Sequence, residues 1–364
     1  MKVYGKNYRA IWIDSDTDSI KIINQLLLPY KFEIKTLSST DDIYNAISSM
    51  EVRGAPVIGA TAAFGVFLAC KEAANYDNPR DYIENSIKKI NSARPTAINL
   101  FHATKTIDDS ITNYNDINKI ISVARTLSIE LAEKNVKDCY QIGLHGLKII
   151  EDIARQKKDK TVNILTHCNA GWLACGDYGT ATAPIYLAHD KGINIHVWVD
   201  ETRPRNQGAK LTAWELGNHG VKHTIIADNT GGHLMQNNMV DMVIVGCDRM
   251  ALNGDFANKI GTYLKALAAY DNNVPFYVAL PTTSIDPSIN NGIKDIPIEI
   301  RSENEIHFIE GIYNNNIISI RTTPENSPAL NYGFDITPAK YVSGVITEKG
   351  IFSATKEDIS MALD

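Results

Sequence analysis

The segment TVNILTHCNAG, residues 161–171, begins the part of the chain that decides the fold. A short apolar run in this segment ends in a polar cluster, and the same order recurs as far as residue 286. The apolar runs are residues 162–165, 193–199, 224–227, 242–245 and 276–280. Such runs are typical of strands buried on both faces of a parallel sheet, and helix-period segments separate them here. We therefore predict an α/β fold with a mostly parallel sheet.

Polar side chains follow each of these runs directly. They occupy residues 166–169, 200–203, 228–229, 247–249 and 282–284. Because the carboxyl ends of parallel strands lie at the same edge of a sheet, polar groups can converge there without disrupting the core. We predict that this edge carries the active site.

The length of the chain predicts two domains. Its 364 residues exceed one ordinary core, and a hydrophobic content of 44% is enough to form two. We expect residues 1–153 to form a smaller, mainly helical domain with a short antiparallel sheet. Residues 154–364 should form the α/β domain, with residues 154–160 as a polar connector.

Periodic patterns locate the other elements. In the first domain, apolar runs within residues 8–37 predict the antiparallel strands. The expected helices cover residues 43–50, 57–72, 79–91 and 97–109, followed by two more within residues 116–153. In the second domain, further helices are expected at residues 258–270 and 338–345.

Charge and cysteine content exclude several classes of protein. The formal charge is −6 and the basic residues are dispersed, which disfavours a nucleic-acid or anionic-membrane surface. Five cysteines without a CxxC pair favour a reducing compartment over a disulfide framework. We find no signal-peptide core and expect no apolar run of membrane-spanning length. These observations predict a cytoplasmic protein.

Cys168 is a candidate reactive thiol. It follows a predicted strand and precedes residues 169–171, where a helix is expected to begin, and a helix start lowers the pKa of a nearby thiol. The alternative is a buried thiol that only packs, as most free cysteines do. His167 is its neighbour, but adjacent strand residues point to opposite faces, so direct pairing is not expected. We interpret His167 as structural.

Asp248 is a candidate general acid or base. It directly follows the apolar run 243–247. Desolvation there would raise the pKa of a carboxyl group unless Arg249 pairs with it. A turn-capping aspartate is the alternative. Asn258 and Lys259 are expected to open the next helix, where the helix dipole opposes a lysine and an anionic partner would explain it. A solvent-facing lysine is the alternative for that position.

Anion-binding groups are expected elsewhere in the chain. Gly54 and Pro56 predict a helix start with exposed backbone N–H groups. Arg94 precedes a proline and should be extended at a helix entrance. The loop 201–208 offers two guanidinium and two amide groups at another strand end. The sequence has no clustered set of histidines and carboxylates that would indicate a catalytic metal.

Several long motifs in the chain are specific when they are taken together. They are RGAPVIGATAAFG (53–65), RPTAINL (94–100), THCNAG (166–171), DETRPRNQGAKLTAWEL (200–216), IADN (226–229), GCDRMALNGDFANKIGTY (246–263) and GFDITPAKYVSGVITEKGI (333–351). Over nearly its whole length the chain resembles the methylthioribose-1-phosphate isomerase family. The superfamily of these enzymes also holds the regulatory subunits of eukaryotic initiation factor 2B.

The resemblance implies roles for individual residues. Cys168 would stabilise the transition state and Asp248 would transfer protons. The implied substrate contacts are Arg53, Gly54, Ala55, Arg94, Gln207, Asn258 and Lys259. The resemblance further implies a Rossmann-like C-terminal domain, a homodimer, no metal and no cofactor. The expected reaction converts 5-methylthioribose 1-phosphate, a phosphorylated sugar of methionine salvage, to 5-methylthioribulose 1-phosphate.

Three alternatives remain at this level. An isomerase of 5-deoxyribose 1-phosphate or ribose 1,5-bisphosphate would keep the same motifs, and residues 171–177 differ from the smaller residues of many family members. A regulatory subunit of the initiation-factor type would bind without catalysis, although the presence of Cys168 and Asp248 argues against it. A nucleotide-dependent dehydrogenase would need a glycine fingerprint that the chain lacks.

Overall fold

The computed structural model describes residues 1–94, 97–158 and 160–364. The chain divides into two compact units. The first contains Met1, Lys6–Cys139 and Trp172–Gly179, and the second contains Lys2–Gly5, Tyr140–Gly171 and Thr180–Asp364.

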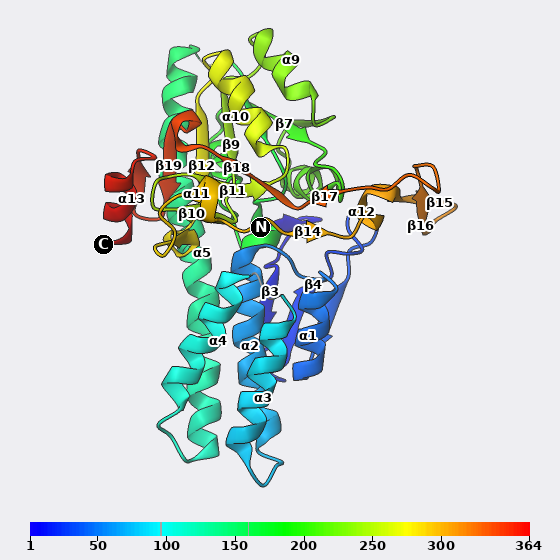
Figure 1. The fold of residues 1–364 in the computed structure, drawn as a ribbon, viewed down its shortest axis with the longest axis vertical. Coiled ribbons are helices and arrows are strands. Elements are labelled where there is room, and N and C mark those ends of the chain that lie inside the picture. The colour runs from blue at the N-terminus through cyan, green and yellow to red at the C-terminus, as the bar shows by residue number, and fades with distance from the viewer. Residues whose placement is uncertain (95–96, 159) are drawn as a thin grey trace. The chain divides into compact units, whose positions relative to one another are not determined.

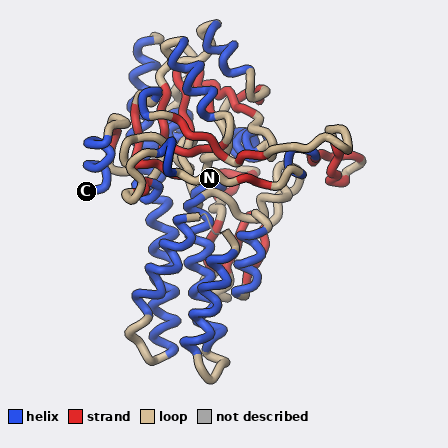
Figure 2. The backbone as a smooth tube through the Cα atoms, viewed as in Figure 1, coloured by secondary structure: helices blue, strands red, loops and turns tan. Residues whose placement is uncertain are grey.

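The first unit is mainly helical. Its helices are α1 (Thr40–Ser48), α2 (Ala55–Ala73), α3 (Pro79–Ser92), α4 (Ile98–Ile111), the first part of α5 (Ile117–Gln156) and the short α6 (Trp172–Cys175). Helix α2 packs against α1, α3 and α4, and Figure 2 shows these helices side by side. The predicted antiparallel sheet is confirmed as strands β3 (Ile11–Ile13), β4 (Ile20–Ile23) and β5 (Ile34–Leu37) in that order.

Helix α2 is the core of this unit. Its side chains are buried over nearly the whole length, from Pro56 to Ala73. By length and hydropathy alone, the helix could cross a membrane, so the expectation that no run reaches that length was wrong. Burial against the neighbouring helices accounts for its apolar composition.

Helix α5 corrects the prediction of two helices within residues 116–153. It runs without a break over 40 residues, because the segment contains no proline and its two glycines, Gly143 and Gly146, make room for neighbours. A Cβ on Gly146 would lie 2.4 Å from Cγ of Pro184. The two units divide between Cys139 and Tyr140, inside this helix, whereas the predicted boundary at 153/154 lies in its last turn. The predicted domain limits therefore stay a prediction.

The second unit is built on a sheet of seven strands. All five predicted strands are present, as β6 (Val162–Thr166), β7 (Ile195–Asp200), β8 (His223–Ile226), β9 (Met242–Val245) and β12 (Phe276–Ala279). Strand β19 (Gly344–Thr347) extends the parallel part, and β20 (Gly350–Phe352) closes it in an antiparallel sense. Figure 1 shows β9, β12 and β19 side by side. The prediction of an α/β fold with a mostly parallel sheet is confirmed.

Strand β19 also corrects a prediction. A helix was expected over residues 338–345, but the chain forms strand β18 (Phe334–Thr337), a 3₁₀ turn at Ala339–Tyr341 and then β19. Val345 and Ile346 pair with Val278 and Ala279 of β12 and are fully buried. Pairing with a buried strand thus overrides a local pattern that resembles a capped helix.

A second sheet corrects the prediction for residues 258–270. Its strands are β13 (Ile285–Asp286), β10 (Arg249–Ala251), β11 (Phe256–Lys259) and β18, in that order. Asn258 and Lys259 therefore end a strand, and the following helix α10 covers Thr262–Asp271. Lys259 therefore lies outside the first turn of α10, and the prediction that the dipole of this helix opposes the lysine was wrong.

The second unit contains further elements besides these sheets. They are β1 (Lys2–Val3), the last part of α5, α7 (Ala183–Asp190), a π-helix (Gly208–Thr212), α8 (Ala213–His219), α9 (Thr230–Gln236), a 3₁₀ turn (Thr282–Ser284), α11 (Gly292–Asp295), β14 (Ile300–Arg301), α12 (Asn304–His307), β15 (Phe308–Tyr313), β16 (Asn316–Arg321), β17 (Asn331–Tyr332) and α13 (Lys356–Leu363).

The order of the parallel strands locates the active edge. Read across the sheet, it is β8, β7, β6, β9, β12, β19, so the connection after β6 runs one way and the connection after β9 runs the other way. Ligands of open α/β sheets bind at such a switch point, beyond the carboxyl ends of the two central strands. Cys168 follows β6 and Asp248 follows β9. The two candidate catalytic residues therefore flank the switch point.

Gly246 brings the loops of these two residues together. It lies two residues before Asp248, and a Cβ at this position would be 2.5 Å from Cβ of Ala170, two residues after Cys168. We predict that Gly246→Ala forces the loops apart and lowers the free energy of unfolding by about 1–3 kcal/mol, as overpacking of a core does.

Gly232 is a matched control in helix α9, where the nearest atom to an added Cβ is 3.6 Å away. Gly232→Ala should leave stability unchanged or raise it slightly, because alanine favours a helix. Urea unfolding of both variants measures the difference. Equal stability of the two would contradict the close contact at Gly246.

Candidate functional site

The backbone of Cys168 is held by hydroxyl groups from two other segments. Its N–H donates to Oγ1 of Thr202 at 2.8 Å, and its carbonyl accepts a hydrogen bond from Oγ1 of Thr212 at 2.7 Å. The residue adopts a left-handed φ of 68°, which a non-glycine residue adopts only when its surroundings require it. The side chain is buried, with 7% of the residue exposed.

Gln207 contacts the thiol directly. Sγ of Cys168 donates to Oε1 of Gln207 at 3.3 Å, so the structure brings together two residues that the sequence predicted separately. Gln207 immediately precedes the π-helix, and π-helical turns occur frequently at functional sites. A Cβ on Gly208 would lie 1.8 Å from the carbonyl oxygen of Asp200, so glycine is needed for this close approach.

The helix expected directly after Cys168 begins later than predicted. Helix α6 starts at Trp172 and has four residues. A helix this short lacks the aligned peptide dipoles on which the expected effect on the thiol depends. The polar contacts from Thr202, Thr212 and Gln207 define the surroundings of Cys168 instead.

Asp228 shapes the loop after β7. Its two carboxylate oxygens accept hydrogen bonds from the N–H groups of Thr202 and Arg203, both at 2.7 Å. Thr202 has a φ of 65°, and its hydroxyl donates to the carbonyl of Asp200 at 3.0 Å. The loop that supplies Gln207 is therefore tied to the ends of both β7 and β8. Sequence analysis placed Asp228 at a strand end but did not predict this role.

A buried glutamate supports the segment after Cys168. Glu215 is fully buried, and its two oxygens accept hydrogen bonds from Nδ2 of Asn169 and from the hydroxyl of Tyr186, both at 3.1 Å. A Cβ on Gly171 would lie 1.8 Å from Oε2 of Glu215, so the glycine backbone passes directly over the carboxylate. Sequence analysis did not find Glu215. Its only signal was a single charge in the apolar pattern of residues 211–216.

Asp248 lies at the predicted strand end, but it is exposed. The expectation that burial surrounds this carboxyl group was therefore wrong for the single chain. Its N–H donates to the carbonyl of Ala257 at 2.9 Å, which places Asp248 beside strand β11 and next to Asn258.

The two residues beside Asp248 have their own surroundings. Nη1 of Arg249 lies 3.7 Å from Oδ2 of Asp286. Burial raises the pKa of the Cys247 thiol well above its usual value, and the charge of Asp248 raises it further.

Asn258 and Lys259 are positioned by strand β11. Asn258 is buried, and its Nδ2 donates to Oγ1 of Thr262 at 3.0 Å. Nζ of Lys259 donates to the carbonyl of Gly333 at 2.9 Å and lies 4.6 Å from the ring centroid of Phe334. The lysine thus extends across the neighbouring strand β18 and its preceding turn.

The other predicted binding residues lie in the first unit. Gly54 is the N-cap of α2 with a φ of 88°, and Pro56 lies in the first turn, which confirms the predicted helix start after Arg53. A Cβ on Gly54 would be 2.4 Å from Cβ of Ala174. Arg94 follows the end of α3 and is half-buried. Residues 95–96 of the predicted break, and residue 159 of the predicted connector, lie outside the described residues.

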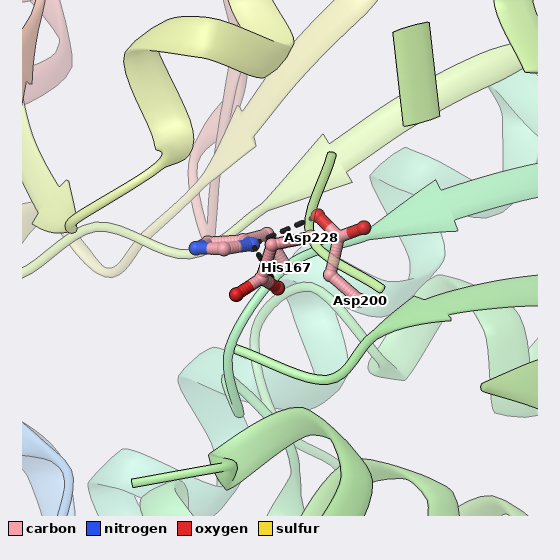
Figure 3. A group of neighbouring side chains, drawn as sticks. All are labelled: His167, Asp200 and Asp228. Carbon is pink, nitrogen blue, oxygen red and sulfur yellow. Dashed lines mark hydrogen bonds and ion pairs between the residues drawn. The ribbon is translucent and has the colours of Figure 1, made fainter. Parts of the chain in front are cut away.

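The structure also brings together a cluster that sequence analysis did not predict. His167, Asp200 and Asp228 each offer one ligand atom, and these atoms lie within 4.8 Å of one another (Figure 3). The expectation that the chain has no clustered set of histidine and carboxylates was therefore wrong. Nδ1 of His167 is already bonded to Oδ2 of Asp200 at 2.8 Å, and Nζ of Lys265 lies 3.1 Å from the same oxygen. Oδ2 of Asp200 is therefore already shared by an imidazole nitrogen and an ammonium group.

The fold and these residues define a class of protein. A doubly wound sheet with a thiol, an amide and a carboxylate around its switch point is typical of a Rossmann-like protein that binds a small ligand. A model of the Initiation factor 2 subunit family matches residues 51–354. The methylthioribose-1-phosphate isomerase of Desulfatibacillum aliphaticivorans is 55% identical over 360 residues, which cover 99% of this chain and 98% of the relative.

Solved structures agree with this match. The crystal structure of 5-methylthioribose 1-phosphate isomerase from Pyrococcus horikoshii OT3 superposes with a TM-score of 0.86 at 35% identity, covering 98% of this chain and 96% of the other. The chain belongs to the methylthioribose-1-phosphate isomerases within the Initiation factor 2 subunit family. A structure of the translation initiation factor eIF-2B, subunit delta, from A. fulgidus is also similar. Its TM-score is 0.81 at 33% identity, covering 98% of this chain and 99% of that one.

Proposed function

We propose that this chain is an isomerase that converts 5-methylthioribose 1-phosphate to 5-methylthioribulose 1-phosphate in methionine salvage. The observation that carries the proposal is the placement of Cys168 and Asp248 on the two sides of the switch point, in a chain 55% identical to a named isomerase of this substrate. The reaction moves one hydrogen from C2 to C1 of the sugar and needs no external oxidant or reductant. No cofactor enters the proposal.

The chemistry explains why an acid is needed. Phosphorylation of the anomeric oxygen prevents the ring from opening as a free hemiacetal does. We assign proton transfer to Asp248. One of these protons reaches the ring oxygen when the bond between C1 and that oxygen breaks. The Cys168 thiol already donates to an amide oxygen of Gln207, so it has the proton needed to stabilise a developing oxygen charge on the substrate.

Asp248 becomes more effective when water is excluded. Its exposure in the single chain means that substrate or a second copy of the chain must cover it before the carboxyl group is desolvated. A homodimer is the assembly we propose, and the cytoplasm is the compartment. The single chain leaves apolar side chains of β15 and β16 exposed, including Ile312 at 53% and Ile317 at 42%. Such exposure is typical of a surface that another chain covers.

Binding residues extend the proposal to the phosphate. We assign substrate contacts to Arg53, Gly54, Ala55, Arg94, Gln207, Asn258 and Lys259. The N-cap of α2 is a glycine without a capping side chain among the described residues, which suits backbone donation to an anion. Arg94 and Lys259 supply positive charge, so the phosphate is bound without a metal.

Sedimentation velocity of the purified protein tests the assembly. We predict a dimer at micromolar concentration, and predict that Ile312→Lys together with Ile317→Lys shifts the equilibrium toward monomer, because charges replace apolar side chains. A monomeric wild-type protein would contradict the proposed dimer. An unchanged dimer in the double variant would exclude β15 and β16 as part of the interface.

The catalytic pair is tested by isosteric variants. Asp248→Asn removes the titrating proton and should lower turnover by ~10²–10⁴-fold, the range for loss of an acid–base group. Cys168→Ser should lower it by ~10²–10³-fold, the range for loss of one transition-state donor. Cys70→Ala is the control, because Cys70 is buried in α2 and should affect only stability. Turnover near wild type in Asp248→Asn rules out the proton-transfer role.

The substrate is tested with three sugars. The cations named above are assigned to one phosphate, and a second buried phosphate without donors costs several kcal/mol. An apolar methylthio group needs only an apolar pocket. A group of this size changes the free-energy difference between two competing substrates by only ~1–3 kcal/mol. We predict that methylthioribose 1-phosphate is converted best, 5-deoxyribose 1-phosphate less well and ribose 1,5-bisphosphate poorly, as followed by phosphorus NMR.

Each other result of this panel has a defined meaning. Preference for the bisphosphate would assign the chain to the sister isomerase. Conversion of none of the three would favour a non-catalytic subunit, in line with the similarity to the initiation-factor structure. EDTA should leave the rates unchanged, and activity that needs a divalent ion would contradict phosphate binding without metal.

A further inference from the structure

Both ring nitrogens of His167 face oxygen atoms. Nδ1 lies 2.8 Å from Oδ2 of Asp200, and Nε2 lies 2.9 Å from the carbonyl oxygen of Ile260. A carbonyl oxygen only accepts, so Nε2 must carry a proton. Nδ1 then either donates to an ionised Asp200 or accepts a proton from a neutral Asp200. The charge of Asp200 therefore decides the state of the ring.

The neighbours of Asp200 favour its ionised form. Nζ of Lys265 lies 3.1 Å from Oδ2 and also donates to the carbonyl of Asp228. Asp200 is 0% exposed and Lys265 3% exposed, so water contributes little screening to this pair. A buried carboxylate next to an ammonium group keeps its charge. With Asp200 ionised, Nδ1 of His167 must be the donor and the ring carries both protons.

The other charges around the ring agree with a cationic His167. Oδ1 of Asp228 lies 3.9 Å from Nδ1, so a second carboxylate faces the same nitrogen. Asp335 also interacts with His167 and Lys265; burial raises the pKa of its carboxyl group, and the N–H groups of Gly261 at 2.7 Å and Tyr263 at 3.1 Å oppose that rise. Lys265 alone does not balance the two carboxylates of Asp200 and Asp228. A protonated His167 brings the group closer to neutrality.

We propose that His167 is a buried imidazolium that positions the two segments on which the reaction depends. It directly precedes Cys168, and it holds the carbonyl of Ile260, which directly follows Lys259. Asp200, its partner, begins the loop that leads to Gln207. One doubly donating ring thus fixes the thiol segment relative to the segment of Asn258 and Lys259. A neutral ring would keep the contact with Asp200 only if that carboxyl group carried the proton.

The contact between Gly261 and the ring supports this role. Gly261 has a φ of 102°, and a Cβ there would lie 3.1 Å from Cε1 and 3.2 Å from Nε2 of His167. The chain therefore passes next to the edge of the ring that carries the Nε2 proton. Only glycine allows this approach together with the left-handed conformation.

NMR of protein labelled with ¹⁵N at histidine tests the state of the ring without substrate. The His167 resonances are assigned by their loss in His167→Gln, or by their shift in Asp200→Asn if the first variant does not fold. We expect both ring nitrogens of His167 to be protonated at pH 7.5, where an exposed histidine with a pKa of about 6.5 is mainly neutral.

His219 is the internal control for this measurement. Its Nε2 lies 2.9 Å from Oδ1 of Asp190, while its Nδ1 is buried and has no partner among the described residues. Burial lowers the pKa of His219, so its ring should carry one proton at pH 7.5. Two protons on His167 and one on His219 support the proposal. A single proton on His167 overturns it, and so does a displacement of the His167 resonances by equimolar Zn²⁺, which would identify a metal site.

Enzyme kinetics test the positioning role of His167. Of the two experiments, only the kinetic one rests on the proposed function. Asp200→Asn and His167→Gln should each lower kcat and raise KM, with a combined loss of ~10–100-fold in kcat/KM, the effect of one hydrogen bond to a charged group. His219→Asn, the matched variant, should leave both constants unchanged. Lower stability with unchanged kcat and KM in Asp200→Asn would reduce His167 to a structural residue. Inactivity of the wild-type protein on all three sugars would overturn the proposed function but leave the NMR result intact.

Discussion

Asp200 holds a carboxylate out of water at the end of β7, and Lys265 and the His167 ring share one of its oxygens. A buried charge is costly unless it is paired, so this carboxylate fixes its partners in place. It holds His167, the residue directly before Cys168. Its backbone carbonyl also accepts a hydrogen bond from the Thr202 hydroxyl, and that hydroxyl accepts the hydrogen bond of the Cys168 N–H. The position of Cys168 therefore depends on this buried ionic contact as well as on its direct contacts with Thr202, Gln207 and Thr212.

The loops at this edge follow one physical rule. Strand ends leave backbone donors and acceptors that no ladder satisfies, and side chains must satisfy them when the loops are buried. Asp228 does so for the loop after β7, and Glu215 does so for the Asn169 side chain that follows β6. Glycines at 171 and 208 allow the backbone to approach these acceptors. The carboxylates of Asp228 and Glu215 thus hold the loops after β7 and β6 in place.

The sequence was sufficient to predict the parallel strands, because short apolar runs that each end in polar residues are typical of strands buried in a parallel sheet. It failed for β11 and β19, whose state depends on pairing with distant strands rather than on local pattern. The same division applies to the site. The positions of Cys168 and Asp248 at strand ends were predictable from the sequence, whereas the contacts of His167, Asp200 and Glu215 depend on partners far away in the sequence. The exposure of Asp248 was also beyond the sequence, since a local apolar run does not say what covers the strand end.

The fold of this family does not determine function by itself, so individual residues must distinguish an isomerase from a binding protein. A named isomerase and a named initiation-factor subunit superpose on this chain with TM-scores of 0.86 and 0.81, so the sheet and its switch point suit both. A binding protein needs a surface, but an isomerase also needs a proton donor and acceptor held within reach of one carbon. In this chain, buried contacts of His167 and Asp200 hold the backbone directly before Cys168, the candidate thiol. Because such contacts cost free energy when any partner is lost, their presence favours a chain in which the position of the thiol matters.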